Sequence, residues 1–119
     1  MELEWEQTLF QLILHAGCAR SSAKEAVDLV DSGKWQEAEA ALTQANEEQI
    51  QAHKINTNII TKAARGENIE FSVLLVHALD LLMLAWSEID NTEQYIRMAN
   101  RLEALEAEVS KWQGQGLKK

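Results

Sequence analysis

Residues 71–86 read FSVLLVHALDLLMLAW, which is the most apolar run of the chain. A helix over this run is apolar on every side, and such a helix is buried on every side. A lone bundle of a few helices cannot bury one of its own members in that way. The excess apolar surface therefore implies a partner, most economically further copies of the same chain.

Gly33 and Gly66 divide the part of the chain that precedes this run. Apolar and small residues recur at helical spacing before Gly33 and again between the two glycines, and no strand-like alternation competes with this pattern. Glycine commonly stands just beyond the end of a helix. We therefore expect helices over three segments, about residues 4–32, 35–65 and 69–90.

Length and composition favour one helical domain. A chain of 119 residues has the size of a single domain. It has no proline and only five glycines, whereas sandwiches and barrels need many turns built on these residues. Helices joined by short turns run up, down and up. The sequence therefore predicts an all-α, antiparallel three-helix bundle.

Apolar residues beyond the third segment recur at alternating steps of three and four, which is the a/d pattern of a short coiled coil. They are Tyr95, Met98, Leu102, Leu105, Val109 and Trp112. The polar residues 90–93 fit either a break with a new helix N-cap or an exposed turn of a continuing helix. We expect a C-terminal helical extension to about residue 112, either continuous with the third helix or separate from it.

Charge and composition exclude several classes of function. The chain has 19 acidic and 11 basic side chains, whereas a protein that binds nucleic acid normally presents a basic face. Cys18, the one cysteine, can form neither an internal disulfide nor a thiolate metal cluster. The acidic N-terminus is unlike a signal peptide, and the apolar run is short for a membrane span. We expect a cytoplasmic protein with no nucleic-acid partner and no direct membrane insertion.

His77 and Asp80 are the candidate functional residues, because both lie inside the apolar run and share a helix face. A buried carboxylate is costly unless it is paired, protonated or bound to a metal. If the third helix lies on a symmetry axis, several copies of Asp80 meet there and either share protons or hold a cation. The alternative is a buried hydrogen bond between His77 and Asp80 that only fixes packing. The sequence contains no glycine-rich phosphate loop, so no motif in it indicates an organic cofactor.

A polar strip on the second helix bears on the same site. A hairpin centred near residues 67 and 68 brings Asn56 and Thr57 close to the level of His77, so these residues are candidate supporting donors. The alternative is that the strip is a solvated face. For His15 and His53, a structural or surface role is expected.

The segment from Val76 to Met83 resembles the histidine-centred helix of the IIA components of the lactose/cellobiose/chitobiose class of the bacterial sugar phosphotransferase system. In that family the segment reads roughly V-H-A-Q-D-H-L-M, and here it reads VHALDLLM. Four further segments resemble the family in the same order, and the resemblance spans roughly residues 6–100. They are AGCARS at 16–21, GKW at 33–35, AH at 52–53 followed by NT at 56–57, and IEFSV at 69–73.

The resemblance implies a homotrimer of three-helix subunits with the third helix innermost. It implies that His77 accepts a phosphoryl group from phosphorylated HPr and passes it to a cysteine of a IIB component during sugar uptake. Asp80 would then lie at the trimer axis, where the family aspartate can hold a divalent cation such as Mg²⁺. Amide and hydroxyl donors on the second helix, Asn56 and Thr57, would support the site. By this reading the chain is a phosphotransferase component.

The chain departs from the family at three of these positions. It has Leu79 in place of glutamine, Leu81 in place of a second histidine and Asn56 in place of glutamine, and it runs on past the usual family end. These changes leave open a second interpretation, a non-catalytic helical interaction or regulatory module on the same trimeric fold. The segment at 33–35 also resembles the start of a tetratricopeptide hairpin, but no second copy follows at the required period.

Overall fold

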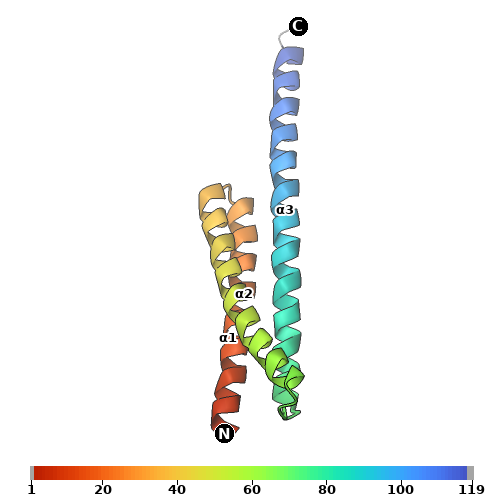
Figure 1. Cartoon of the computed structure of the whole chain (residues 1–119). Helices are drawn as coiled ribbons and strands as arrows, with labels where there is room; N and C mark the ends of the chain where they lie inside the picture. The colour runs from red at the N-terminus through yellow and green to blue at the C-terminus, as the bar shows by residue number, and fades with distance from the viewer. Residues whose placement is uncertain (1, 118–119) are drawn as a thin grey trace.

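The computed structural model describes residues 2–117, and it describes the side chains of residues 3–114. The described chain forms three helices and no strand: α1 (Glu2–Asp31), α2 (Trp35–Ala64) and α3 (Val73–Leu117). α1 and α2 form an antiparallel hairpin, and α3 runs beside α1 in the same direction as α1 (Figure 1). This arrangement confirms the predicted all-α, up-down-up bundle.

Two glycines end the first two helices. Gly33 has a φ of 75° and Gly66 a φ of 83°, values that glycine adopts without the Cβ clash of other residues. At the first turn, the backbone N–H of Lys34 donates to the carbonyl of Leu29, and at the second, that of Glu67 donates to the carbonyl of Lys62. These bonds satisfy carbonyls that the helix ends leave unpaired.

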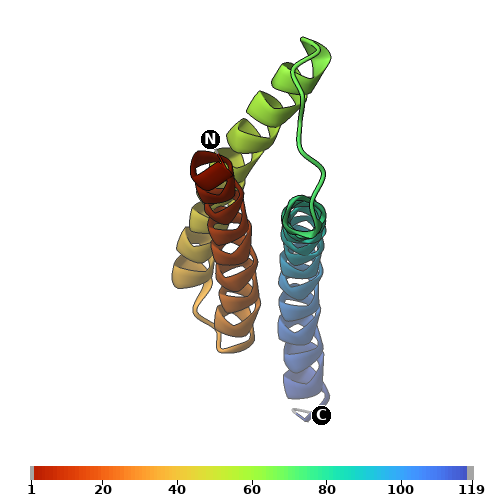
Figure 2. The same cartoon turned by 90° about the horizontal axis from the view of Figure 1, so that it is seen from below.

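The helices pack through two clusters of buried residues. One cluster contains the larger side chains from all three helices and lies toward the start of α1 and α3: Leu9, Leu12, Ala52, Ile59, Leu75, Ala78 and Leu82. The other is built mostly of alanine and lies toward the α1–α2 turn: Ala16, Ala19, Ala23, Ala45, Ala85 and Ile89. α2 crosses the bundle at an angle, and residues 65–72 lead the chain from its end back to α3 (Figure 2).

α3 begins at Val73, four residues later than the sequence pattern indicated. The cause is Ser72, whose hydroxyl oxygen accepts a hydrogen bond of 3.1 Å from the backbone N–H of Leu75. This is the geometry of a helix N-cap, which satisfies one of the unpaired amides of the first turn. Residues 65–72 therefore form the connection rather than the first turn of α3.

α3 continues without a break through residues 90–93 and is 45 residues long. Thr92, which could have capped a separate helix, is instead buried, and its hydroxyl lies 3.5 Å from the carbonyl oxygen of Ala23 on α1. The far end of α3 extends well past the α1–α2 turn, so the molecule measures 78 × 21 × 20 Å (Figure 1). Within the described residues, no helix combines the length and the apolar character that crossing a membrane requires.

Candidate functional site

The first turns of α3 have one face packed inside the bundle and one face open. Leu75, Ala78 and Leu82 point into the core cluster, and Ala78 is fully buried. On the opposite side, Val73 is 83% exposed and Leu84 is 50% exposed. Apolar side chains at this level of exposure, gathered on one face of a helix, are typical of an interaction surface.

His77 and Asp80 both lie on the exposed side of α3. Among the described residues, neither side chain has a hydrogen-bond or ion-pair partner. The imidazole of His77 is therefore accessible to a reacting partner. Asp80 lies between exposed apolar residues on the same helix, including Val76 and Leu84, so a partner that covers this face would also enclose the Asp80 carboxylate.

The other two histidines are engaged within one copy of the chain. Nδ1 of His15 on α1 lies 2.6 Å from a carboxylate oxygen of Glu48 on α2. Because a carboxylate only accepts, this ring nitrogen carries the proton and donates. His53 on α2 packs against Trp86 on α3, with ring centroids 5.3 Å apart. His77 is thus the histidine of the three that is exposed and without such a contact.

The position of Trp86 also shows where α2 lies relative to His77. Each residue turns a helix by about 100°, so His77, nine residues before Trp86, lies about half a turn away from the side that faces α2. Asn56 on α2 is half-buried and Thr57 is exposed. Any contact of these two residues with His77 therefore requires α2 of a neighbouring copy, and their supporting role stays a prediction.

The two leucines that replace family residues pack inside the copy. Leu79 lies against the core cluster of larger side chains, and Leu81 lies against the alanine cluster. Both are half-buried, whereas His77 is exposed. Leu79 and Leu81 therefore contribute to packing within the bundle, and they leave the face that carries His77 unobstructed.

Sequence patterns gave no signal for an unpaired buried amide in the centre of α2. Gln49 is 5% exposed, and neither its amide nitrogen nor its carbonyl oxygen has a hydrogen-bond partner among the described residues. A buried polar group without a partner lowers stability. The glutamine follows the helical spacing of Ala45 and Ala52, which places it on the inward face of α2.

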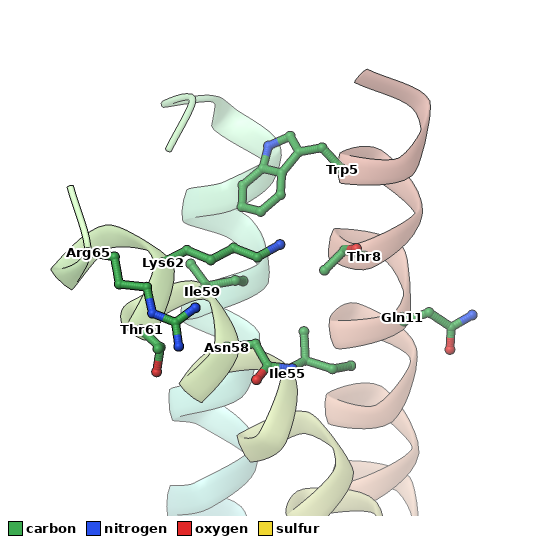
Figure 3. A pocket seen from close by; sticks show the side chains of 9 residues that line it. All are labelled: Trp5, Thr8, Gln11, Ile55, Asn58, Ile59, Thr61, Lys62 and Arg65. Carbon is green, nitrogen blue, oxygen red and sulfur yellow. The ribbon is translucent and has the colours of Figure 1, made fainter. Parts of the chain in front are cut away.

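A pocket near the chain's start does not contain the predicted site residues. It has a volume of about 430 Å³ and lies between the start of α1 and the end of α2 (Figure 3). Its lining residues are Trp5, Thr8, Gln11, Ile55, Asn58, Ile59, Thr61, Lys62 and Arg65. The lining holds no histidine, cysteine or carboxylate, so the hydroxyls of Thr8 and Thr61 have no imidazole or carboxylate in this pocket to activate them.

Comparison with known proteins identifies the class of protein to which this chain, with its fold and its exposed His77, belongs. Residues 7–100 match the family described as "PTS system, Lactose/Cellobiose specific IIA subunit". Because the match covers well over half of the chain, the chain belongs to this family. Phosphoryl transfer is the general role of the family, and the resemblance noted in the sequence is confirmed.

Individual relatives agree with the family assignment. The chain is 41% identical over 102 residues to the lichenan-specific phosphotransferase enzyme IIA component of Bacillus subtilis, a match that covers 86% of this chain and 93% of the relative. It is 35% identical to a cellobiose-specific EIIA component of Lactococcus lactis, a match that covers 80% of this chain and 82% of the relative. A crystal structure of the cellobiose-specific enzyme IIA of Bacillus anthracis superposes with a TM-score of 0.82 at 44% identity, covering 84% of this chain and 92% of that one.

Proposed function

We propose that His77 is the residue that carries the phosphoryl group in this IIA component. It would accept the group from phosphorylated HPr and pass it to the cysteine of a IIB component, during uptake of a sugar of the lactose/cellobiose/chitobiose type. The observation that supports this assignment is the contrast among the three histidines. His15 and His53 are engaged with side chains of other helices, whereas His77, which is exposed as His53 is, has no such contact.

The chemistry needs only an imidazole that two partners can reach in turn. A neutral imidazole nitrogen attacks phosphorus, a nitrogen–phosphorus bond forms, and the bond from phosphorus to HPr breaks. In the second step, the thiolate of IIB attacks phosphorus and the bond to His77 breaks. The two steps leave the imidazole unchanged. Apart from the phosphorylated His77, the transfer needs no covalent intermediate on this protein. The rest of the protein contributes positioning and compensation of charge.

We propose that the exposed face of α3 is covered by other copies in a homotrimer, with α3 innermost. This arrangement would bury Val73 and Leu84, which a single copy leaves open. It would place His77 at the boundary between two copies. Asn56 and Thr57 on α2 of the neighbouring copy would then act as donors to the phosphoryl oxygens. HPr and the IIB component would approach this boundary from outside the bundle, in the cytoplasm.

Asp80 is the residue that could hold a divalent cation in such a trimer. Within one copy, the described residues contain no group of three or more histidine, cysteine or acidic side chains suited to a metal ion. A site could therefore form only where copies of Asp80 meet. Carboxylate oxygens are the ligands that Mg²⁺ prefers, so the donor set fits a cation of this kind. A bound cation would supply charge compensation among the carboxylates, and no step of the transfer depends on it.

The experiment that tests the assignment measures the intact mass of the protein after incubation with phosphoenolpyruvate, enzyme I and HPr. The wild type and the control variants His15→Ala and His53→Ala are each expected to gain one phosphoryl group, and His77→Ala is expected to gain none. An adduct that persists in folded His77→Ala would overturn the assignment. An unmodified wild type, with donors that phosphorylate a known IIA component, would instead favour the non-catalytic interaction module.

A further inference from the structure

The last part of α3 has no neighbour within its own copy. Every side chain from residue 100 to residue 114 is exposed, and α3 runs on alone above the other two helices (Figure 1). The match to the family ends at the same place, residue 100. This segment therefore belongs neither to the bundle nor to the part of the chain that the family shares.

An isolated helix of this length is only marginally stable in water, because most helix stability in proteins comes from packing an apolar face. This segment has such a face. The apolar residues of this segment, together with Tyr95 and Met98 just before it, are between 41% and 69% exposed and follow alternating steps of three and four along α3: Tyr95, Met98, Leu102, Leu105, Val109 and Trp112. We refer to these six residues as the distal seam. A continuous row of this kind is the seam of a coiled coil.

The distal seam continues the face of α3 that is open beside the bundle. Steps of three or four residues lead back from Tyr95 through Asn91 and Ser87 to Leu84 and Asp80. The same helix side therefore carries the proximal apolar surface, a short polar stretch and the distal seam. A partner that lies along the first part of this face reaches the second part without a change of direction. A second copy of α3 meets that condition, because its own face has the same order of apolar and polar residues.

Charges beside the distal seam favour copies that run in parallel. In a parallel coiled coil, the g residue, just before an a position of the seam, lies near the e residue of the neighbouring helix, just after the following d position. Here those residues are Arg101, which precedes Leu102, and Glu106, which follows Leu105. They carry opposite charges, so each interface between parallel copies pairs a cation with an anion.

We propose that residues 95–112 form a parallel coiled coil with the same segment of other copies. This coiled coil stabilises the assembly through contacts beyond the bundle. The number of strands equals the number of copies in the assembly, three for the homotrimer of the proposed function. The inference rests on self-association of α3, and it does not rest on phosphoryl transfer. The distal seam is thus an interaction surface whose partner is a second copy of this chain.

The first test compares charges placed on the distal seam with the same charges placed on the far side of the helix. Leu102→Asp with Leu105→Asp puts two carboxylates into the seam, and Ala104→Asp with Ala107→Asp puts two on the opposite face. Sedimentation of the full chain over a dilution series measures self-association. We expect the seam variant to dissociate at a concentration roughly a hundredfold or more higher than the wild type, and the control to match the wild type.

The second test reports the direction of the helices. In a Cys18→Ser background, Val109→Cys places a thiol in the distal seam, and Ala107→Cys places one on the outer face. In parallel copies, residue 109 meets its own equivalent, so mild oxidation should link Val109→Cys chains in pairs much faster than Ala107→Cys chains. Antiparallel copies would hold these thiols far apart.

Equal self-association of the seam variant and its control would overturn the proposal and would point to a different protein as the partner of the distal seam. Equal linking of the two cysteine variants would also overturn it. Neither outcome depends on His77. A wild type that forms the coiled coil but accepts no phosphoryl group would contradict the proposed function and leave this inference standing.

Discussion

The hydroxyl of Tyr95 on α3 donates a hydrogen bond to the carboxylate of Asp31, the last residue of α1. This contact joins residues that are 64 positions apart and lies where α3 begins to extend past the bundle. The carboxylate stabilises the protonated phenol, and the hydrogen bond to Asp31 is the main cause that raises the pKa of Tyr95 above its usual value.

A raised pKa in the folded state makes this contact dependent on pH. The contribution of the hydrogen bond to stability is fully present below the pKa of an unfolded tyrosine, about 10. It is lost as the pH rises through the higher pKa of the folded state. We expect Tyr95→Phe to melt at a lower temperature than the wild type at neutral pH, with a difference that disappears in strong alkali.

Thermal melts of both proteins between neutral pH and strong alkali check this prediction. Tyr95 is the only tyrosine, so its ionisation can be followed directly by absorbance of the tyrosinate. A folded-state midpoint at or below that of a free tyrosine would contradict the assigned contact.

Removal of the unpaired amide of Gln49 should stabilise the protein. Methionine has a similar length and no group that needs a hydrogen bond, so Gln49→Met should raise the free energy of unfolding by about 1–3 kcal/mol. Urea unfolding at fixed protein concentration measures the change. Gln51→Met, two residues on and exposed, is the matched control and should have little effect. A loss of stability in Gln49→Met alone would show that the amide is satisfied in the assembled protein.

Restoring the second family histidine should cost stability. Leu81 is half-buried against the alanine cluster, so Leu81→His replaces an apolar contact with a polar ring and should lower the free energy of unfolding by about 1–2 kcal/mol. Gln51→His, on an exposed position of α2, controls for the histidine itself. If Leu81→His instead equals or exceeds the wild type in stability, the packing role given to Leu81 is wrong.

The backbone at Gly33 provides a separate test of the α1–α2 turn. Its φ of 75° strains any residue with a Cβ, although no atom lies within 4 Å of the added carbon. Gly33→Ala should therefore lower the free energy of unfolding by about 1–2 kcal/mol through strain alone. Asn tolerates this region better than alanine does, so Gly33→Asn should lose less. Equal losses in the two variants, measured by urea unfolding, would indicate that something other than backbone strain decides stability there.

Part of this architecture could be read from local patterns. The helical spacing of apolar residues predicted the helical class, because each helix has an apolar face that repeats with the helix period. The two glycines predicted the ends of α1 and α2, because positive φ is a local property. Ser72 also carried a local signal, a serine three residues before the buried Leu75, which marks an N-cap and would have placed the start of α3 correctly.

Other features depend on contacts between distant residues, which local patterns do not contain. The pairing of His15 with Glu48 joins residues 33 positions apart, and the stacking of His53 on Trp86 joins α2 to α3. These contacts leave His77 as the histidine without a partner among the described side chains. The sequence placed Asn56 and Thr57 near the level of His77 but gave no information on rotation about the helix axes. The structure shows that α2 of the same copy faces the other side of α3.

In the proposed function, His77 both receives a phosphoryl group and passes it on. Its most direct test mixes purified phosphorylated protein with a IIB component of a cellobiose-type system and follows the mass of both proteins with time. We expect one phosphoryl group to leave this protein and to appear on the cysteine of IIB. A group that stays on this protein or is lost to water, while the same IIB accepts one from a known IIA component, would show that His77 does not pass the group on.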